Sequence, residues 1–268
     1  MAFGACDKYR ESELEIIESL FGMRPLIAGN WKMNTLRSEA TALVAGLMEQ
    51  RAERDPGCDM LVCPPFVTLR LVADFIEGSP IALGGQDCHT ENSGAHTGDV
   101  SAKMLSDAGC EFVIVGHSER RADHQEDDTL IASKAEAAHA NALKAVICVG
   151  ETLDQRNAEE TLAIVETQLN NSAPEGTTAE NTVVAYEPVW AIGTGLTPTI
   201  EQISEVHNHM RTLLEARFSD GSEFRLLYGG SMNPRNAREI LAIDNVNGGL
   251  VGGASLKVED FWSICTSV

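Results

Sequence analysis

The chain has 268 residues, of which 43% are hydrophobic, and its 40 acidic and 20 basic side chains give a formal net charge of −20. A chain of this length and apolar content can bury a large core, as one closed α/β barrel or as two smaller domains, and its composition excludes a disordered protein. The acidity argues against nucleic acid and against an anionic membrane as partners, because both are recognised by basic surfaces.

The lack of a recognisable targeting signal and the pattern of cysteines both lead us to expect a cytoplasmic protein. The N-terminus has no basic segment followed by an apolar one, and no apolar run approaches the roughly 20 residues that span a bilayer. The seven cysteines are an odd number, and Cys63, Cys110 and Cys148 lie in or beside apolar runs. This pattern favours buried reduced thiols over a disulfide framework, as is usual for cytoplasmic proteins.

Residues 1–22 precede the first strand-like run and stand apart from the rest of the chain. Within them, the segment 11–21 has apolar side chains at helical spacing, and Gly22 ends the pattern. We expect a short amphipathic helix here, as an N-terminal extension to which we assign no role.

From Arg24 onward the chain repeats one theme: a short apolar run, a polar or glycine-rich link, and then a helix-like segment. The apolar runs are 26–30, 60–63, 81–86, 112–115, 145–150, 183–186, 225–228 and 249–251. The helical candidates include 38–54, 127–143, 154–170 and 199–218. Strands that alternate with helices pair in parallel through right-handed crossovers. Eight such units within residues 24–268 predict a single (β/α)8 barrel, the TIM-barrel architecture, for which roughly 250 residues is usual.

A doubly wound open sheet is the alternative architecture for alternating strands and helices. Such a sheet normally carries a glycine-rich phosphate-binding turn after its first strand, whereas the link 31–34 reads WKMN and has no glycine. No Pro-, Ser- or Gly-rich linker divides the chain. We therefore predict one barrel domain.

In such a barrel the chemistry lies at the carboxyl ends of the strands. The first predicted strand delivers Asn30 and Lys32, an amide and a cation. The fourth delivers His117 just before a helix-start pattern, where a helix dipole can hold the imidazole neutral. The sixth delivers Glu187, and Pro188 ends its pairing. These strand ends supply the residue types that acid–base chemistry requires.

The segment after Glu187 and the last two strands suggest how a ligand is held. Residues 188–195 are apolar and contain glycines, which is typical of a mobile loop that brings backbone N–H groups close to a ligand. Glycine pairs at 229–230 and 252–253 follow the seventh and eighth strands, where their backbone can approach a ligand closely. Either pair alone would be better explained as a tight turn. The loops after these two strands commonly form the phosphate site of a barrel.

Other candidate motifs favour structural roles. Cys88, His89 and His96 fall in one loop and give only a weak indication of a metal site. His207 and His209 are two residues apart on a predicted helix, so they do not share a face as a zinc pair would. We predict no metal site, and the chain also lacks a Walker sequence and a complete dinucleotide-binding motif.

Six stretches together resemble the triosephosphate isomerase family, in the order in which the family has them. They are GNWKMN from Gly29, VIVGHSERR from Val113, CVGET from Cys148, AYEPVWAIGTG from Ala185, YGGSMNP from Tyr228 and LVGGASLK from Leu250. The resemblance covers residues 24–268 and implies a cofactor-free isomerase. It implies that dihydroxyacetone phosphate and D-glyceraldehyde 3-phosphate are interconverted by proton transfer through an enediolate, in glycolysis and gluconeogenesis.

The resemblance also implies roles for single residues. Glu187 would be the base that moves a proton between two adjacent carbons, and His117 the neutral electrophile at the carbonyl. Lys32, beside Asn30, would stabilise the enediolate charge. The phosphate would be bound largely through backbone N–H groups and the dipole at the loops: Gly193, Ser231, Gly252 and Gly253.

By the same resemblance, residues 190–194 would close over the site as a lid. An enediolate phosphate can eliminate phosphate when solvent reaches it, so closure would protect the intermediate. The far hinge of the lid reads Leu196-Thr197-Pro198, where the family often has a lysine and an alanine. We expect this departure to affect the kinetics of the lid and to leave the chemistry intact.

The loop 88–99 resembles the interdigitating loop with which family members insert into a second subunit. The resemblance implies an isologous homodimer, with Thr97 near the partner's site. Asp99 stands where the family more often has glutamate. We expect the loss of one methylene to leave the pairing intact.

Two alternative functions remain open at the level of the sequence. Another phosphosugar isomerase on the same barrel would share the phosphate loops without the set Lys32, His117 and Glu187. A catalytically silent barrel would bind a phosphorylated ligand as a regulatory module. The presence of all three reacting side chains argues against the silent barrel, and a coupled assay with several phosphosugars separates the two isomerases.

Overall fold

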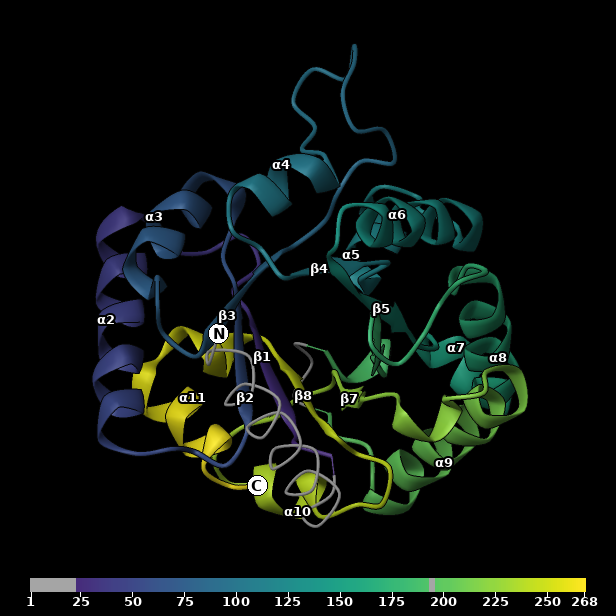
Figure 1. Cartoon of the computed structure of the whole chain (residues 1–268). Coiled ribbons are helices and arrows are strands. Elements are labelled where there is room, and N and C mark those ends of the chain that lie inside the picture. Colours follow the sequence, from purple (N-terminus) through teal and green to yellow (C-terminus); the bar gives the residue numbers. More distant parts are fainter. Residues whose placement is uncertain (1–22, 193–195) are drawn as a thin grey trace, which may run out of the picture.

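The computed structural model describes residues 23–192 and 196–268, and within them it has the predicted barrel. Strands β1 to β8 pair in sequence order, every neighbouring pair is parallel, and β8 pairs with β1 to close the barrel. Figure 1 shows the strands in the middle and the helices in a ring around them. The architecture is therefore confirmed. The extension 1–22 and Gly193 lie outside the described residues.

The strands begin and end within one residue of the predicted apolar runs. Their bounds are β1 Leu26–Asn30, β2 Asp59–Cys63, β3 Ile81–Gly85, β4 Phe112–Val115, β5 Lys144–Val149, β6 Thr182–Tyr186, β7 Leu226–Tyr228 and β8 Gly248–Val251. Nearly all of their residues are buried. This burial explains the continuous apolar runs, because the barrel interior covers one face of each strand and the helices cover the other.

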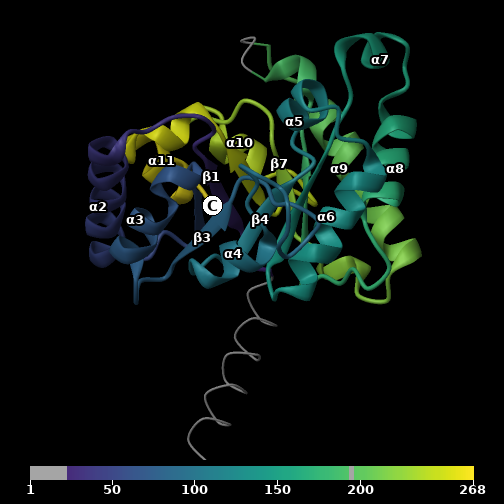
Figure 2. The same ribbon diagram turned by 90° about the horizontal axis from the view of Figure 1, so that it is seen from above.

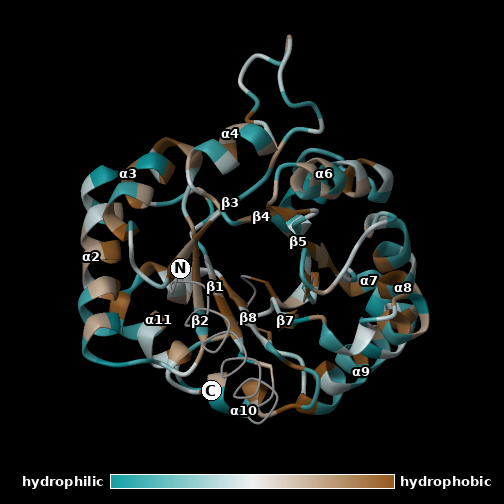
Figure 3. Ribbon diagram, in the orientation of Figure 1, coloured by the Kyte–Doolittle hydropathy of each residue, from teal (hydrophilic) through white to brown (hydrophobic). Residues whose placement is uncertain are grey.

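Successive strand side chains point alternately into the barrel and toward the helices. Leu26 and Ala28 belong to the cluster inside the barrel, whereas Ile27 between them packs in the outer cluster with the helices. Figure 3 shows apolar strands surrounded by helices with hydrophilic outer sides. The interior is thus a packed core, and a ligand can be held only at an end of the barrel.

The helices lie between the strands, and several begin at a side chain that accepts a backbone N–H group. Thr199, Asp127 and Ser101 are the caps of α9, α6 and α4. The bounds are α2 Arg37–Glu53, α3 Phe66–Ile76, α4 Ala102–Asp107, α5 Ser118–Asp123, α6 Asp128–Ala140, α7 Leu153–Asn157, α8 Thr161–Ser172, α9 Ile200–Arg217, α10 Ala237–Leu241 and α11 Val258–Cys265. Figure 2 shows α5 and α7 at one end of the barrel. This is the end at which the strands finish, because α5 follows β4 directly.

The prediction of one helix over 154–170 is wrong. The structure has two helices there, α7 and α8, separated by residues 158–160. Glu159 has a φ of +61°, a left-handed conformation that an α-helix does not contain. Because α7 buries none of its side chains, the apolar spacing of this region belongs to α8 alone.

The six cysteines of the described ranges are free and buried, as the sequence predicted for Cys63, Cys110 and Cys148. Burial raises the pKa of the Cys63 and Cys110 thiols, which therefore stay protonated. Within residues 23–192 and 196–268, each helix is too short or too polar to cross a bilayer.

Candidate active site

The ends of the strands surround a cavity of about 610 Å³. Seven of the eight predicted site residues line it: Asn30, Lys32, His117, Glu187, Ser231, Gly252 and Gly253. The eighth is Gly193, which the structure does not describe. Asn30 is the last residue of β1, and the other six follow β1, β4, β6, β7 and β8. They meet because parallel strands of a barrel all finish at the same end.

Glu187 follows β6 directly, and only 2% of its surface is exposed. Its backbone N–H donates to the carbonyl of Val149 at 2.8 Å, which continues the pairing of β5 and β6 past the strand end. The Ser118 N–H donates to Oε2 at 2.9 Å, and His117 Nε2 lies 2.9 Å from Oε1. The carboxylate is therefore held by the connection between β4 and α5.

The pKa of Glu187 is set by opposing effects. Burial raises it, because a charge is poorly solvated in the protein interior. His117, the amide of Ser118 and the charge of Lys32 lower it by more, and the net pKa lies below the ordinary value of a glutamate. The carboxylate is ionised at neutral pH, which is the state that a general base requires.

His117 is the N-cap of α5, and its Nδ1 accepts a hydrogen bond from the Glu119 N–H at 3.2 Å. A ring nitrogen that accepts a backbone N–H carries no proton, so the neutral ring has its proton on Nε2 and donates it to Glu187. Burial lowers the pKa of His117, and the Glu187 carboxylate raises it by more. The pKa of His117 is thus raised while the two side chains are in contact.

Lys32 has a φ of +52°, which costs a residue other than glycine on the order of 1–3 kcal/mol. Two side chains hold this backbone: its N–H donates to Asn30 Oδ1 at 3.0 Å, and its carbonyl accepts from Gln86 Nε2 at 2.9 Å. The turn directs Nζ into the cavity, where it pairs with Glu119 Oε1 at 2.5 Å. The strained backbone of Lys32 is thus stabilised by two side-chain hydrogen bonds, and it places the positively charged Nζ in the cavity.

The glycine pair at 229–230 is required by packing. A Cβ on Gly230 would overlap the Tyr228 hydroxyl, and a Cβ on Gly229 would lie 2.9 Å from Cγ of Glu187. The sequence suggested that both glycine pairs serve the close approach of a ligand. For this pair the close approach is to neighbouring side chains, although both glycines also line the cavity.

The glycine pair at 252–253 faces open space. A Cβ on Gly253 would meet nothing within 4 Å, and a Cβ on Gly252 would meet only Cε of Lys32 at 3.4 Å. The Gly252 carbonyl accepts two hydrogen bonds from Ser255, one from its N–H at 2.8 Å and one from its hydroxyl at 2.6 Å. The backbone here can approach an anion without steric hindrance.

Sequence reasoning missed Glu151, which is fully buried at the end of β5. Its carboxylate accepts hydrogen bonds from Tyr186 Oη at 3.1 Å, Trp190 Nε1 at 2.8 Å and Arg156 Nη1 at 3.2 Å. It thus ties Trp190, the first residue of the predicted lid, to the neighbouring strand end. Glu119 was assigned no role either. Two signals were available for both residues: each follows a strand end closely, and each lies within a stretch that resembles the family, CVGET or VIVGHSERR.

The two helical histidines contact different parts of the molecule, as their spacing predicted. Nδ1 of His207 lies 2.9 Å from the Asn245 carbonyl, and burial lowers the pKa of His207 to about 4. His209 lies 3.4 Å from a carboxylate oxygen of Glu166. Both histidines are therefore part of the packing around α9.

The fold and the cavity define a class of protein. An ionised carboxylate contacts an imidazole beside a lysine, and an open glycine backbone lies across the same cavity at the carboxyl end of a (β/α)8 barrel. This is an enzyme of acid–base chemistry that acts on a small anionic molecule.

Comparison with known proteins identifies the family. The family model for triosephosphate isomerase matches residues 25–268. The triosephosphate isomerase of Bradyrhizobium diazoefficiens is 54% identical over 243 residues, which is 90% of this chain and 96% of the relative. That of Brucella abortus is 52% identical over 248 residues, with 91% and 96% covered. The crystal structure of triosephosphate isomerase from Bartonella henselae superposes with a TM-score of 0.85 at 43% identity, covering 91% of this chain and 99% of that one. The chain belongs to the triosephosphate isomerase family.

Proposed function

We propose that Glu187 is the base with which this chain interconverts dihydroxyacetone phosphate and D-glyceraldehyde 3-phosphate, the reaction of its family in glycolysis. One observation carries the assignment of the base. The buried carboxylate of Glu187 lies 2.9 Å from His117 Nε2, inside the cavity that Lys32 also lines. The cytoplasm is the proposed location, in keeping with the acidic composition and the cysteine usage.

The reaction requires a base and a site for negative charge at the same time. A proton next to a carbonyl group is only weakly acidic, so its removal depends on donors aimed at the oxygen that becomes negative. Glu187 would take the proton from one carbon and return it to the next. His117 would donate to the developing oxyanion through Nε2, and Lys32 would favour its charge, with Asn30 beside it.

The protonation state of His117 follows from the groups around the ring. In the resting site the Glu187 carboxylate raises the pKa of His117. A substrate bound between the two side chains would separate them and remove that effect. Burial, the Glu119 N–H, which donates to Nδ1, and the charge of Lys32 would remain and favour the neutral ring. The Glu119 carboxylate, 3.6 Å from Nδ1, opposes them and ranks below burial and Lys32 among the effects on the pKa of His117. His117 would therefore act as a neutral donor during the reaction.

The phosphate would be bound opposite the base. Ser231, Gly252 and Gly253 line the cavity, and the last two have open space in front of their backbone. Backbone N–H groups bind an anion without adding a positive side chain. Gly193 would add a further N–H when the lid 190–194 closes, and closure would keep water away from the enediolate.

The decisive experiment replaces Glu187 by glutamine, which has nearly the same shape and no basic oxygen. We expect kcat for the triose phosphates to fall by about 10²- to 10⁴-fold, the usual contribution of a general base, with KM changed much less. Glu175→Gln, which changes an exposed carboxylate between α8 and β6, outside the cavity and outside the loop 88–99, is the matched control and should keep wild-type kcat. Unchanged isomerisation by a folded Glu187→Gln variant would show that the base is wrong.

A coupled assay with several phosphosugars separates the rival isomerase from the proposed one. Turnover of trioses and not of larger sugars is the expected result. Activity on larger sugars alone would reject the proposed substrate. Tight binding of triose phosphate without turnover would favour the silent barrel.

We also propose that the chain forms a homodimer through the loop that contains Thr97. In Figure 1 this loop, between β3 and α4, projects beyond the ring of helices. Large apolar side chains are exposed after the neighbouring strands β1 and β2, with Met33 at 96% and Val67 at 89% exposed. A second copy that covered them would remove this apolar surface from water.

Val67→Glu tests the dimer by placing a charge on the proposed interface. Sedimentation velocity should give a dimer for the wild type and a monomer for Val67→Glu. Leu153→Glu is the control, because Leu153 is also exposed but lies on α7, on the other side of the barrel (Figure 1). A wild-type monomer, or dimers of equal affinity in both variants, would contradict the proposed interface.

A further inference from the structure

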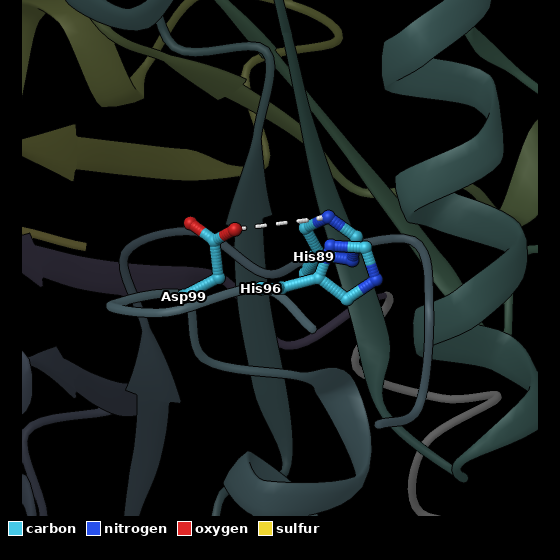
Figure 4. A group of neighbouring side chains, drawn as sticks. All are labelled: His89, His96 and Asp99. Carbon is cyan, nitrogen blue, oxygen red and sulfur yellow. Dashed lines mark ion pairs between the residues drawn. The ribbon is translucent and has the colours of Figure 1, made fainter. Parts of the chain in front are cut away.

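Three side chains of the loop between β3 and α4 converge on one point. They are His89, His96 and Asp99, and one nitrogen or oxygen atom of each lies within 4.8 Å of the others. Figure 4 shows the Asp99 carboxylate directed at the His89 ring, against which the His96 ring is stacked. We propose that these three residues bind a divalent transition-metal ion, at a site separate from the catalytic cavity.

The backbone brings the three ligands together before any ion is bound. His89 lies at the start of the loop, where its N–H donates to the Val100 carbonyl at 2.8 Å and a parallel bridge joins it to Ser101. At the other end, the Asp99 N–H donates to the His96 carbonyl at 3.1 Å. This tight turn contains Gly98 with a φ of +97°. The turn places His96 and Asp99 on the same side, facing His89.

The side chains must rearrange to hold a first-row transition metal. The rings of His89 and His96 are stacked, with centroids 4.0 Å apart and a tilt of 35°, so one ring must turn before nitrogens of both can reach the same ion. His89 Nε2 and Asp99 Oδ2 are 3.7 Å apart. Two ligands that are each about 2.0–2.2 Å from a tetrahedral ion are roughly 3.4 Å apart, so the pair needs to close by only a few tenths of an ångström. Two imidazoles and one carboxylate are typical ligands of zinc, cobalt, nickel and iron, whereas calcium and magnesium prefer oxygen ligands. Three protein ligands also leave a position for water.

The hydrogen bonds of His89 set a condition for binding. Its Nδ1 accepts from the Glu91 N–H at 2.9 Å, so the neutral ring carries its proton on Nε2, the atom that faces Asp99. An ion bound at Nε2 requires that this proton move to Nδ1, and the contact with the Glu91 N–H then opens. Because Glu91 is exposed, water can replace that contact. The ion would therefore change the backbone at the start of the loop.

Cys88 is not a member of this site, although the sequence grouped it with the two histidines. Its side chain points into the protein, where Sγ donates to the Lys134 carbonyl at 3.6 Å. Burial raises the pKa of Cys88 to about 12, so the sulfur is a protonated thiol and a poor metal ligand. Asp99 supplies the third ligand instead. In the described part of the chain, no other three such residues converge in this way.

Titration of the full chain with Co²⁺ after treatment with a chelator tests the site. We expect one saturable site per chain, with the d–d absorption of a nitrogen- and oxygen-ligated ion and without a thiolate charge-transfer band. Zn²⁺ should displace Co²⁺ from it. His96→Ala and Asp99→Asn should each weaken binding by at least about tenfold, as expected for the loss of a ligand.

His124→Ala is the matched control, because His124 is exposed but lies outside the cluster, at the end of α5. It should bind Co²⁺ as the wild type does. The proposal is overturned if the wild type shows no saturable binding, if a thiolate band shows that cysteine holds the ion, or if His96→Ala and Asp99→Asn bind with wild-type affinity. All three changes are at side chains that are exposed in the single chain, so the barrel should fold in each variant. Because His96 and Asp99 flank Thr97 in the proposed dimer loop, sedimentation velocity should show the same oligomeric state for each variant as for the wild type before their affinities are compared.

Discussion

Replacing Gly229 by alanine tests whether the position of the Glu187 carboxylate limits catalysis. The added methyl group would lie 2.9 Å from Cγ of Glu187 and 3.0 Å from the Tyr186 carbonyl oxygen. Carbon atoms that are not bonded to each other lie at roughly 3.5–4.0 Å, so the added methyl group and Cγ of Glu187 must move apart by about 0.6–1 Å. The Tyr186 carbonyl is fixed by the Gly229 N–H at 2.7 Å. The side chain of Glu187 is therefore the part that moves.

A displacement of about 1 Å at a reacting group can cost on the order of 10²-fold in rate, which is about 3 kcal/mol of activation free energy. We expect kcat of Gly229→Ala in the coupled isomerase assay to fall by about this factor. KM should change less, because Gly252 and Gly253 lie on another loop and only Ser231 of the proposed phosphate site is near Gly229 in the chain. Overpacking should also lower the free energy of unfolding by about 1–3 kcal/mol.

Gly46→Ala separates the loss of rate from the loss of stability. A Cβ at Gly46 would lie 2.7 Å from Cγ2 of Val258, a similar clash between α2 and α11 and not at the cavity. This variant should lose stability to urea and keep wild-type kcat. A folded Gly229→Ala variant with wild-type kcat would refute the reasoning, as would an equal loss of kcat in Gly46→Ala.

Two further predictions concern stability. Burial lowers the pKa of His207 from 6.5, its value in the unfolded chain, to about 4 in the folded chain. As the pH falls, the unfolded state therefore binds the proton first. The free energy of unfolding should decrease from about pH 6.5 down to about pH 4. From pH 7.5 to pH 5, the free energy of urea unfolding should decrease by about 2 kcal/mol more in the wild type than in His207→Gln. Equal decreases would contradict the lowered pKa of His207. Trp190→Phe removes the donor 2.8 Å from Glu151 and should lower the unfolding free energy by about 1–3 kcal/mol in the same measurement, whereas an unchanged value would show that this hydrogen bond does not hold the segment.

Most of the fold was predictable because each strand is buried on both faces and is therefore apolar throughout. The runs found in the sequence and the strands of the barrel agree to within one residue at each end. The positions of Asn30, His117 and Glu187 then follow from topology, since parallel strands finish at one end of the barrel. The break between α7 and α8 was not predictable, because Glu159 adopts a left-handed φ without a glycine or proline to signal it.

Parts of the site that depend on long-range packing were not predictable either. Glu151 meets Tyr186 and Trp190 only when β5 and β6 are side by side, and the spacing of these residues in the sequence contains no sign of the contact. The same holds for Gly229, whose missing side chain makes room for Glu187. Sequence patterns thus placed the proposed reacting groups at one end of the barrel, and tertiary contacts determine how those groups are held.

The net charge of −20 does not conflict with an anionic substrate, because the charges that matter are those at the cavity. Charges on the outer helices are screened by salt beyond about 8–10 Å. At the cavity itself, Lys32 is already paired with Glu119, so this one cation cannot balance a phosphate alone. An open backbone at Gly252 and Gly253 offers N–H dipoles that do not depend on net charge. The net negative charge of the chain is therefore compatible with binding of an anion. A few peptide groups at the ends of β7 and β8 can set the affinity for the phosphate.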